Sequence, residues 1–244
     1  MNIAVVFAGG VGSRMNSRSI PKQFLSIHGK PIIIHTLENF ENHPEIDAIT
    51  IACIESGISY LEELLEKYNI KKVKKIVPGG KTGQLSIYHG LCAAEAAASG
   101  EKSIVLIHDG VRPFITPQVI SENIASVREY GSAITCVRAK ETVLTVDGYE
   151  GMAIKKVLDR KKTCFARAPQ SFWLDEILGM QRKALEEGKD NFIDSCSLMQ
   201  YFGKQLNLVE GPEENIKITT PDDFYIMRAL LDAREDMQIN GLGM

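Results

Sequence analysis

Long hydrophobic runs are absent from this 244-residue sequence. The first apolar run, residues 3–7, has no basic residue ahead of it and stops at Gly9-Gly10, and charged residues interrupt every later candidate. A membrane-spanning helix needs about 20 consecutive apolar residues, and a signal peptide needs a basic start followed by a longer apolar run. We therefore expect no membrane partner, and we expect residues 3–7 to form a buried strand.

An excess of charge of one sign is also lacking. The 28 Lys and Arg residues nearly balance the 31 Asp and Glu residues, which gives a net charge of −3, and 44% of the residues are hydrophobic. This composition excludes a disordered chain and a strongly basic protein that coats a polyanion. We expect a folded protein without a nucleic-acid partner, large enough to bury about three quarters of its unfolded surface.

Cysteines are few and isolated. The five cysteines form no C-x-x-C pair, so neither a disulfide framework nor a zinc site is indicated. This pattern is typical of the reducing cytoplasm, where we expect the protein to act. The five residues are Cys53, Cys92, Cys136, Cys164 and Cys196.

Short β-rich runs alternate with longer helical patterns along the chain. This order predicts an α/β fold with a doubly wound, mostly parallel sheet and helices on both faces. Ligands of such sheets bind at the carboxyl ends of the strands. The expected strands are residues 3–7, 48–52, 76–77, 103–107 and 133–137, and the expected helices are residues 31–40, 59–68 and 85–98, with further helices beginning at Thr116-Pro117 and Thr220-Pro221.

Residues 140–160 depart from this alternation. Asp147-Gly148 lies between two apolar-rich runs, residues 142–146 and 152–158, which predicts a β-hairpin. A hairpin that projects from the sheet exposes apolar surface, which a second copy of the chain would cover; an ordinary edge hairpin is the alternative. No linker divides the chain, so we expect a single domain over residues 1–244, with residues 140–160 as a dimerisation arm.

A glycine-rich loop follows the first expected strand. Residues 8–15 read AGGVGSRM, and residues 21–24 read PKQF. Met15 stands where a dinucleotide-binding fingerprint needs its third glycine, and the Gly80-Lys81-Thr82 sequence lacks the leading glycine of a P-loop. Backbone N–H groups of such a loop bind anions, and Arg14 and Lys22 add two cations, which favours a triphosphate over a simple tight turn.

Two further stretches carry charged residues beside expected strand ends. Asp109 follows the strand at residues 103–107 and could hold Mg²⁺, while Arg112 could hold a phosphate; a plain Asp109–Arg112 salt bridge is the alternative. His108 is expected to be packed or bonded to a loop and not catalytic. Lys217 lies between apolar neighbours in a possible strand that reaches the site, or else it is a surface lysine.

Taken together, these stretches resemble the cytidylyltransferase family that includes 2-C-methyl-D-erythritol 4-phosphate and ribitol-5-phosphate cytidylyltransferases. The resemblance extends from Ala8 to Asp223, with the motifs in the same order and at similar spacing. It rests on AGGVGSRM at residues 8–15 with PKQ at 21–23, HDGVRP at 108–113, PQSF at 169–172 and NIKIT at 215–219. It implies a Rossmann-like nucleotide-diphospho-sugar transferase fold.

The resemblance also implies roles for particular residues. Arg14, Lys22 and Lys217 would be catalytic, holding the CTP phosphates, and Asp109 would ligate Mg²⁺. On the acceptor side Arg112 would face the substrate phosphate, while Thr142 and Arg160 would reach the neighbouring subunit's site from the arm. The residues that would line the nucleotide site are Ala8, Gly9, Gly10, Gly12, Gly80, Ser86 and Asp109.

The sequence departs from the family pattern at three positions. The family usually has an arginine where Gly83 stands, and threonines where Ala168 and Ile193 stand. The two lost hydroxyls would bind methylerythritol phosphate, and residues 7–10, 33–36, 111–114 and 194–196 look more like those of the ribitol-phosphate enzymes. We therefore favour a polyol phosphate, D-ribitol 5-phosphate, as acceptor for teichoic-acid or capsule synthesis, with methylerythritol phosphate of isoprenoid biosynthesis as the alternative.

Two other functional classes remain in view. A nucleotide-binding regulator without turnover is favoured by Gly83 and disfavoured by the intact set Arg14, Lys22, Asp109 and Lys217. A dinucleotide-dependent oxidoreductase is disfavoured by Met15. The sequence as a whole predicts a nucleotidyltransferase.

Overall fold

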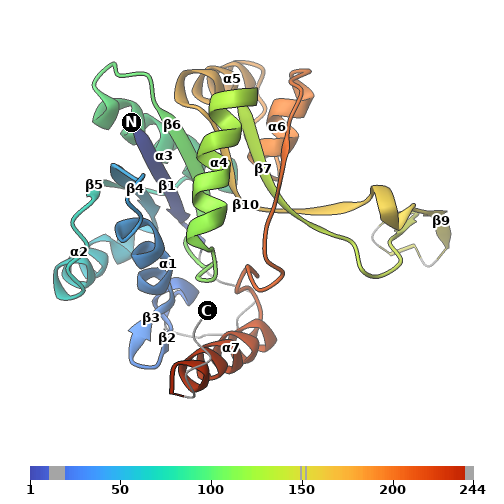
Figure 1. Ribbon diagram of the computed structural model, residues 1–244. Coiled ribbons are helices and arrows are strands. Elements are labelled where there is room, and N and C mark those ends of the chain that lie inside the picture. Colours follow the sequence, from blue (N-terminus) through green and yellow to red (C-terminus); the bar gives the residue numbers. More distant parts are fainter. Residues whose placement is uncertain (11–19, 149, 152, 240–244) are drawn as a thin grey trace.

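The computed structural model describes residues 1–10, 20–148, 150, 151 and 153–239, and its centre is a seven-stranded sheet (Figure 1). The strand order is β11-β7-β10-β6-β1-β4-β5. Neighbouring strands are parallel except β10, which is antiparallel to both β6 and β7. The strands are β1 (Asn2–Ala8), β4 (Ala48–Cys53), β5 (Val73–Pro78), β6 (Ile104–Asp109), β7 (Ser132–Arg138), β10 (Cys164–Trp173) and β11 (Leu208–Glu210).

Helices cover both faces of this sheet. Alternate residues of β1 point to opposite faces: Ala4 and Val6 pack with α1, α2 and α4, whereas Ile3 and Val5 pack with α3, α5 and α6. Both faces are buried, so β1 is a continuous apolar run. The helices are α1 (Ile32–Glu41), α2 (Ile58–Lys67), α3 (Gly83–Ala98), α4 (Pro117–Tyr130), α5 (Leu174–Glu186) and α6 (Ser195–Tyr201).

The predicted doubly wound, mostly parallel α/β fold is confirmed. The predicted strands and helices are present with ends shifted by a few residues, except the possible strand around Lys217, which does not form. The Thr116 side chain caps α4 by accepting a hydrogen bond from the Val119 N–H at 3.4 Å. Strands β10 and β11 and helices α5 and α6 were not predicted. The pattern of β10 is hard to recognise because its first part is exposed and its second part is buried.

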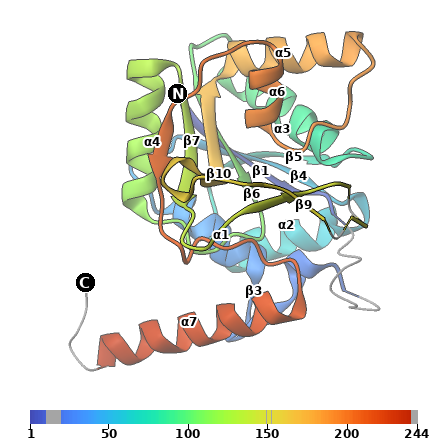
Figure 2. The ribbon, with the colours of Figure 1, turned by 90° about the vertical axis from the view of Figure 1, so that its right-hand side faces the viewer.

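The predicted hairpin is confirmed as an arm that projects from the sheet (Figures 1 and 2). It consists of the antiparallel strands β8 (Leu144–Val146) and β9 (Ile154–Val157), with Leu144 opposite Val157. Several large apolar side chains of the arm and of the adjoining end of β10 are at least 44% exposed to solvent. They are Leu144, Val146, Ile154, Val157 and Phe165.

A last helix, α7 (Pro221–Ile239), lies beneath α1, next to the short strands β2 (Ser26–Ile27) and β3 (Lys30–Pro31) (Figure 2). Met227 packs with Ile218, Ile32 and Phe114, and this small core anchors the segment that leads into the helix. The helix begins after Thr220, as predicted: the Thr220 hydroxyl accepts a hydrogen bond from the Asp223 N–H at 3.3 Å, and the Asp223 carboxylate accepts one from the Thr220 N–H at 2.8 Å. Among the described residues, no helix combines the length and apolar character that crossing a bilayer requires.

Candidate active site

Two glycine-containing loops meet at the carboxyl edge of the sheet. A Cβ atom added at Gly79 would lie 3.0 Å from the Gly9 Cα, and one added at Gly9 would lie 2.8 Å from the Ser86 Oγ. Only glycine allows so close an approach. The Ser86 hydroxyl accepts a hydrogen bond from the Gly80 N–H at 3.0 Å and donates to the Thr82 carbonyl at 3.0 Å. This serine therefore stabilises the second loop in the conformation that lies close to the first.

The two loops line a pocket that we call the glycine-loop pocket. It brings together most of the residues that the sequence singled out for nucleotide binding, although they come from four separate parts of the chain. Gly12 and Arg14, which were assigned to the same site, lie outside the described residues. The predicted residues that line this pocket are Ala8, Gly9, Gly10, Lys22, Gly80, Ser86, Asp109 and Lys217.

A second pocket, which we call the arginine pocket, adjoins the first. Its walls include Arg112 at one side and residues of β10 and the start of α6 at the other. Four residues line both pockets: Phe7, Gly83, Asp109 and Lys217. The site is thus a pair of cavities that share one charged junction, an arrangement suited to two substrates that react with each other. The other residues of the arginine pocket include Arg167, Ala168, Gln170, Ile193, Asp194 and Ser195.

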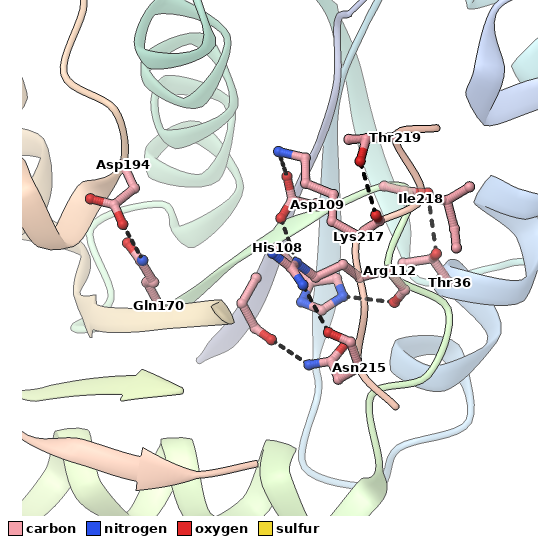
Figure 3. Close-up of polar contacts among 12 residues, drawn as sticks. Thr36, His108, Asp109, Arg112, Gln170, Asp194, Asn215, Lys217, Ile218 and Thr219 are labelled. Atoms are coloured by element: carbon pink, nitrogen blue, oxygen red, sulfur yellow. Dashed lines mark hydrogen bonds and ion pairs between the residues drawn. The ribbon is translucent and has the colours of Figure 1, made fainter. Parts of the chain in front are cut away.

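Asp109 occupies the junction with a cation on each carboxylate oxygen (Figure 3). The Lys217 Nζ lies 2.6 Å from Oδ1, and the Arg112 Nε lies 2.7 Å from Oδ2. Burial acts to raise the pKa of this carboxyl, but the charges of Lys217 and Arg112 outweigh it and lower the pKa to about 2. The Asp109–Arg112 salt bridge considered above therefore exists, and a second cation joins it. Asp109 is ionised at any physiological pH.

Lys217 reaches the junction from a segment without strand structure. The prediction of a strand there is wrong, because residues 211–220 leave the sheet after β11. Their backbone makes isolated hydrogen bonds, such as that from the Ile218 N–H to the Val111 carbonyl, and these do not form the regular ladder of a strand. The Lys22 Nζ donates to the Ile218 carbonyl at 3.3 Å, so the two lysines approach the site side by side in structure although 195 positions separate them. Lys217 thus lines both pockets, as a residue that reaches the site would.

His108 supports the loop that carries Asp109 and Arg112. It is fully buried, its Nε2 donates to the Arg112 carbonyl at 3.0 Å, and its ring packs edge-on against Phe40 at 5.1 Å between centroids. Burial lowers its pKa to about 4, so the ring is neutral. The structure confirms that this histidine is packed and bonded to a loop.

The junction fits Mg²⁺ as a site with a single protein carboxylate, that of Asp109. Among the described residues, no three side chains of His, Cys, Asp or Glu gather into a metal cluster. Mg²⁺ is commonly bound by one or two carboxylates, with substrate phosphates and water completing the shell. Asp109 is an ionised carboxylate that opens onto both pockets, so it would hold the metal together with bound phosphates, after giving up one of its two cations.

Thr142 and Arg160 do not enter the site of their own chain. Arg160 begins the short helix η4 (Arg160–Lys162), and its Nη1 donates to the Lys140 carbonyl at 2.8 Å. Neither residue lines either pocket. Both belong to the projecting arm, away from the two pockets of the same chain.

The sequence did not single out Arg167, and it noted Ser195 only within residues 194–196 without giving it a role; both residues line the arginine pocket. Their neighbours gave a signal, because Arg167 precedes the PQSF motif and Ser195 follows Asp194. Gln170 and Asp194 tie these two regions together through a hydrogen bond of 2.9 Å (Figure 3). Residues next to a motif can thus line the same pocket as the motif itself.

Comparisons with known proteins agree with this geometry. Residues 2–233 match the family model described as 2-C-methyl-D-erythritol 4-phosphate cytidylyltransferase. The chain is 53% identical to a ribitol-5-phosphate cytidylyltransferase of Streptococcus agalactiae over 99% of this chain and 100% of that one. It is 49% identical to the enzyme of that name from Vibrio parahaemolyticus, again over 99% and 100%.

More distant relatives have the methylerythritol name. A 2-C-methyl-D-erythritol 4-phosphate cytidylyltransferase of Clostridium botulinum is 40% identical over 95% of this chain and 97% of that one. The solved structure of 4-diphosphocytidyl-2C-methyl-D-erythritol synthase from Anaerococcus prevotii superposes with a TM-score of 0.81 at 28% identity, covering 95% of this chain and 96% of that one. The likeness therefore extends over nearly the whole chain.

Proposed function

The chain belongs to the 2-C-methyl-D-erythritol 4-phosphate cytidylyltransferase family, and from that premise we propose that it transfers CMP from CTP to D-ribitol 5-phosphate, releasing pyrophosphate. The observation that carries this proposal is the pair of pockets that share Asp109 and Lys217, one lined by the anion-binding glycine loops and the other by arginines. Both substrates are anions, and their reacting phosphates would meet at that junction.

The reaction needs no activated side chain. The second pKa of a phosphate monoester is about 6, so the acceptor is largely a dianion near pH 7 and can attack without a general base. An acceptor phosphate oxygen forms a bond to the α-phosphorus of CTP, and the bond from that phosphorus to the β-phosphate oxygen breaks with its electron pair leaving on pyrophosphate. The protein's contribution is to hold two repelling anions in line and to balance the charge that develops.

The residues of the junction divide this work. Lys22 and Lys217, with Arg14 from the glycine-rich loop, would bind the triphosphate and the developing negative charge. Mg²⁺ held by Asp109 would neutralise phosphate charge further. Arg112, which also bonds the Asn215 carbonyl at 2.8 Å, would face the acceptor phosphate while it keeps Asp109 in place. The absence of a nucleophile–base pair in the sequence motifs agrees with this chemistry.

Ribitol 5-phosphate is favoured over methylerythritol phosphate on two grounds. The relatives named for ribitol 5-phosphate are 53% and 49% identical, whereas the C. botulinum relative named for methylerythritol phosphate is 40% identical. Two residues of the arginine pocket, Ala168 and Ile193, offer no hydroxyl, and the Ile193 side chain is 91% exposed. With this acceptor, we propose that the product serves teichoic-acid or capsule synthesis and that it is made in the cytoplasm.

A single assay tests the acceptor. The enzyme is supplied with CTP and Mg²⁺ and, in parallel, with D-ribitol 5-phosphate, 2-C-methyl-D-erythritol 4-phosphate and other pentose phosphates, and pyrophosphate release is followed. We expect kcat/KM for ribitol 5-phosphate to exceed that for methylerythritol phosphate by at least about tenfold, a difference of about 1.4 kcal/mol in transition-state binding. Faster turnover of methylerythritol phosphate would identify the isoprenoid enzyme, and no turnover of any acceptor would favour a nucleotide-binding regulator.

We also propose that the arm binds a second copy of the chain. Its exposed apolar side chains, Leu144, Val146, Ile154 and Val157, form an unusually apolar surface for a hairpin in water. Thr142 and Arg160 lie on the same arm and would enter the partner's site. The whole chain, residues 1–244, then functions as one domain with a dimerisation arm.

Mixed dimers test this arrangement. Arg160→Ala is expected to impair acceptor use, and Lys22→Ala is expected to impair catalysis in the pocket of its own chain. A mixture of the two inactive variants should regain up to about a quarter of wild-type activity, because half of the dimers are mixed and each of these has one intact site. Activity that stays at the level of the separate variants would show that the arm serves its own chain. Lys155→Ala, on the same arm, is the matched control.

A further inference from the structure

Arg167 lines the arginine pocket, and its guanidinium forms no ion pair with the residues that the structure describes. It lies where the pairing of β10 with β7 is irregular, between Ala166 and Gln170. Its Nε is buried and has no hydrogen-bond partner among the described residues. Buried guanidinium N–H groups are nearly always bonded, so this donor indicates a missing ligand.

The charged side chains near Arg167 do not neutralise its positive charge. Burial, and then the charge of Arg112, lower its pKa, while Glu213 acts in the opposite direction. Glu213, however, is already in an ion pair with Lys140. At the other side of the pocket Arg112 and Lys217 are both paired with Asp109. An arginine held near other cations without a carboxylate of its own is suited to an anion.

Ser195 adds an independent observation in the same pocket. Its side chain is 1% exposed, and the hydroxyl has no partner among the described residues. The neighbouring Asp194 carboxylate accepts hydrogen bonds from the Ser197 N–H at 2.8 Å, from the Ser197 hydroxyl at 2.6 Å and from Gln170 at 2.9 Å, and its contacts within the described part of the chain include neither Ser195 nor Arg167. The pocket therefore has two unpaired groups, a cationic donor and a hydroxyl.

We propose that Arg167 and Ser195 bind the phosphate of the acceptor and thereby restrict the enzyme to phosphorylated polyols. A guanidinium presents two N–H groups at once to phosphate oxygens, and a hydroxyl donates to a third. This inference rests on the proposed function, because it assigns the second pocket to the acceptor. It adds to the site a cation that is separate from Asp109 and its two partners.

Kinetics of four variants test the assignment. Arg167→Met removes the charge and keeps much of the length, Arg167→Lys keeps the charge without the planar fork, and Ser195→Ala removes the hydroxyl. Arg182→Met is the matched control, since Arg182 is exposed and pairs with Glu95 on another face. Thermal denaturation of each variant verifies that it is folded.

We expect Arg167→Met to raise KM for ribitol 5-phosphate by about 10–100-fold, because hydrogen bonds to charged groups contribute about 1.5–3 kcal/mol. KM for CTP should change less than about twofold, Arg167→Lys should recover part of the loss, and Ser195→Ala should have a smaller effect of the same kind. Equal changes in both KM values, or no change in either, would overturn the proposal and leave the proposed function standing.

A binding measurement separates this inference from the proposed function. Inorganic phosphate is titrated calorimetrically into the wild type, Arg167→Met and Arg182→Met proteins. We expect at least about tenfold weaker binding in Arg167→Met alone, whether or not the wild type turns over ribitol 5-phosphate. Equal phosphate affinity in all three proteins would overturn the role of Arg167, and failure of the turnover assay alone would overturn only the acceptor.

Discussion

Replacing Lys22 by alanine is expected to lower kcat by about 100-fold or more while the protein remains folded. The ammonium group lines the glycine-loop pocket, and it would contact the charge that develops as pyrophosphate leaves. Removing one such contact to a transition state costs a factor of about 10² to 10³. Steady-state pyrophosphate release measures kcat, and circular dichroism verifies the fold.

The matched control is Lys74→Ala, since Lys74 is an exposed lysine on β5. Its kcat should equal that of the wild type. If Lys22→Ala also retained the wild-type kcat, the triphosphate would have to bind elsewhere, and the assignment of the glycine-loop pocket would be wrong.

Asp109→Asn is expected to have the second large effect, on both turnover and stability. The change removes the charge that balances Lys217 and Arg112, and Arg112 is only 7% exposed. Removing one partner of a buried ion pair costs about 3–5 kcal/mol, because the remaining charge is left uncompensated. The same change removes the carboxylate that would hold Mg²⁺, so kcat should fall by about 10³-fold or more.

Urea unfolding measures the loss of stability, and pyrophosphate release at increasing Mg²⁺ concentration measures the loss of function. Asp236→Asn, an exposed acid on α7, should change neither. A folded Asp109→Asn protein with wild-type stability and an unchanged Mg²⁺ requirement would contradict the role given to the junction. Ligand-free crystals of the variant would then show where Lys217 and Arg112 find other partners.

The sequence predicted the fold well, because most elements follow simple patterns. Strand β1 is an uninterrupted apolar run, and the starts of α4 and α7 have a threonine followed by a proline. Parallel strands place their carboxyl ends along one edge, so the loops after β1, β5 and β6 had to gather there. That is why the glycine loop and Asp109 could be assigned to one edge of the sheet from the strand pattern, whereas Gly80 was assigned to the site through the family resemblance.

Other features could not be predicted, for physical reasons. Strand β10 is antiparallel and irregular, and its first residues extend toward the arm, so no alternation revealed it. Arg167 lies at that irregularity and lines the arginine pocket. The non-strand conformation of the segment that carries Lys217 depends on the packing of Ile218 with α7, a tertiary contact without a local signal. Gly12 and Arg14 lie outside the described residues, so their roles stay predictions.

A crystal structure with Mg²⁺ and CDP-ribitol, the product that retains both halves of the reaction, tests the central claim most directly. The account predicts cytidine between the Gly9 and Gly80 loops, the phosphate derived from ribitol 5-phosphate between Arg112 and Arg167, and the metal on Asp109. A product that lies entirely in the glycine-loop pocket, with the arginine pocket empty, would contradict it.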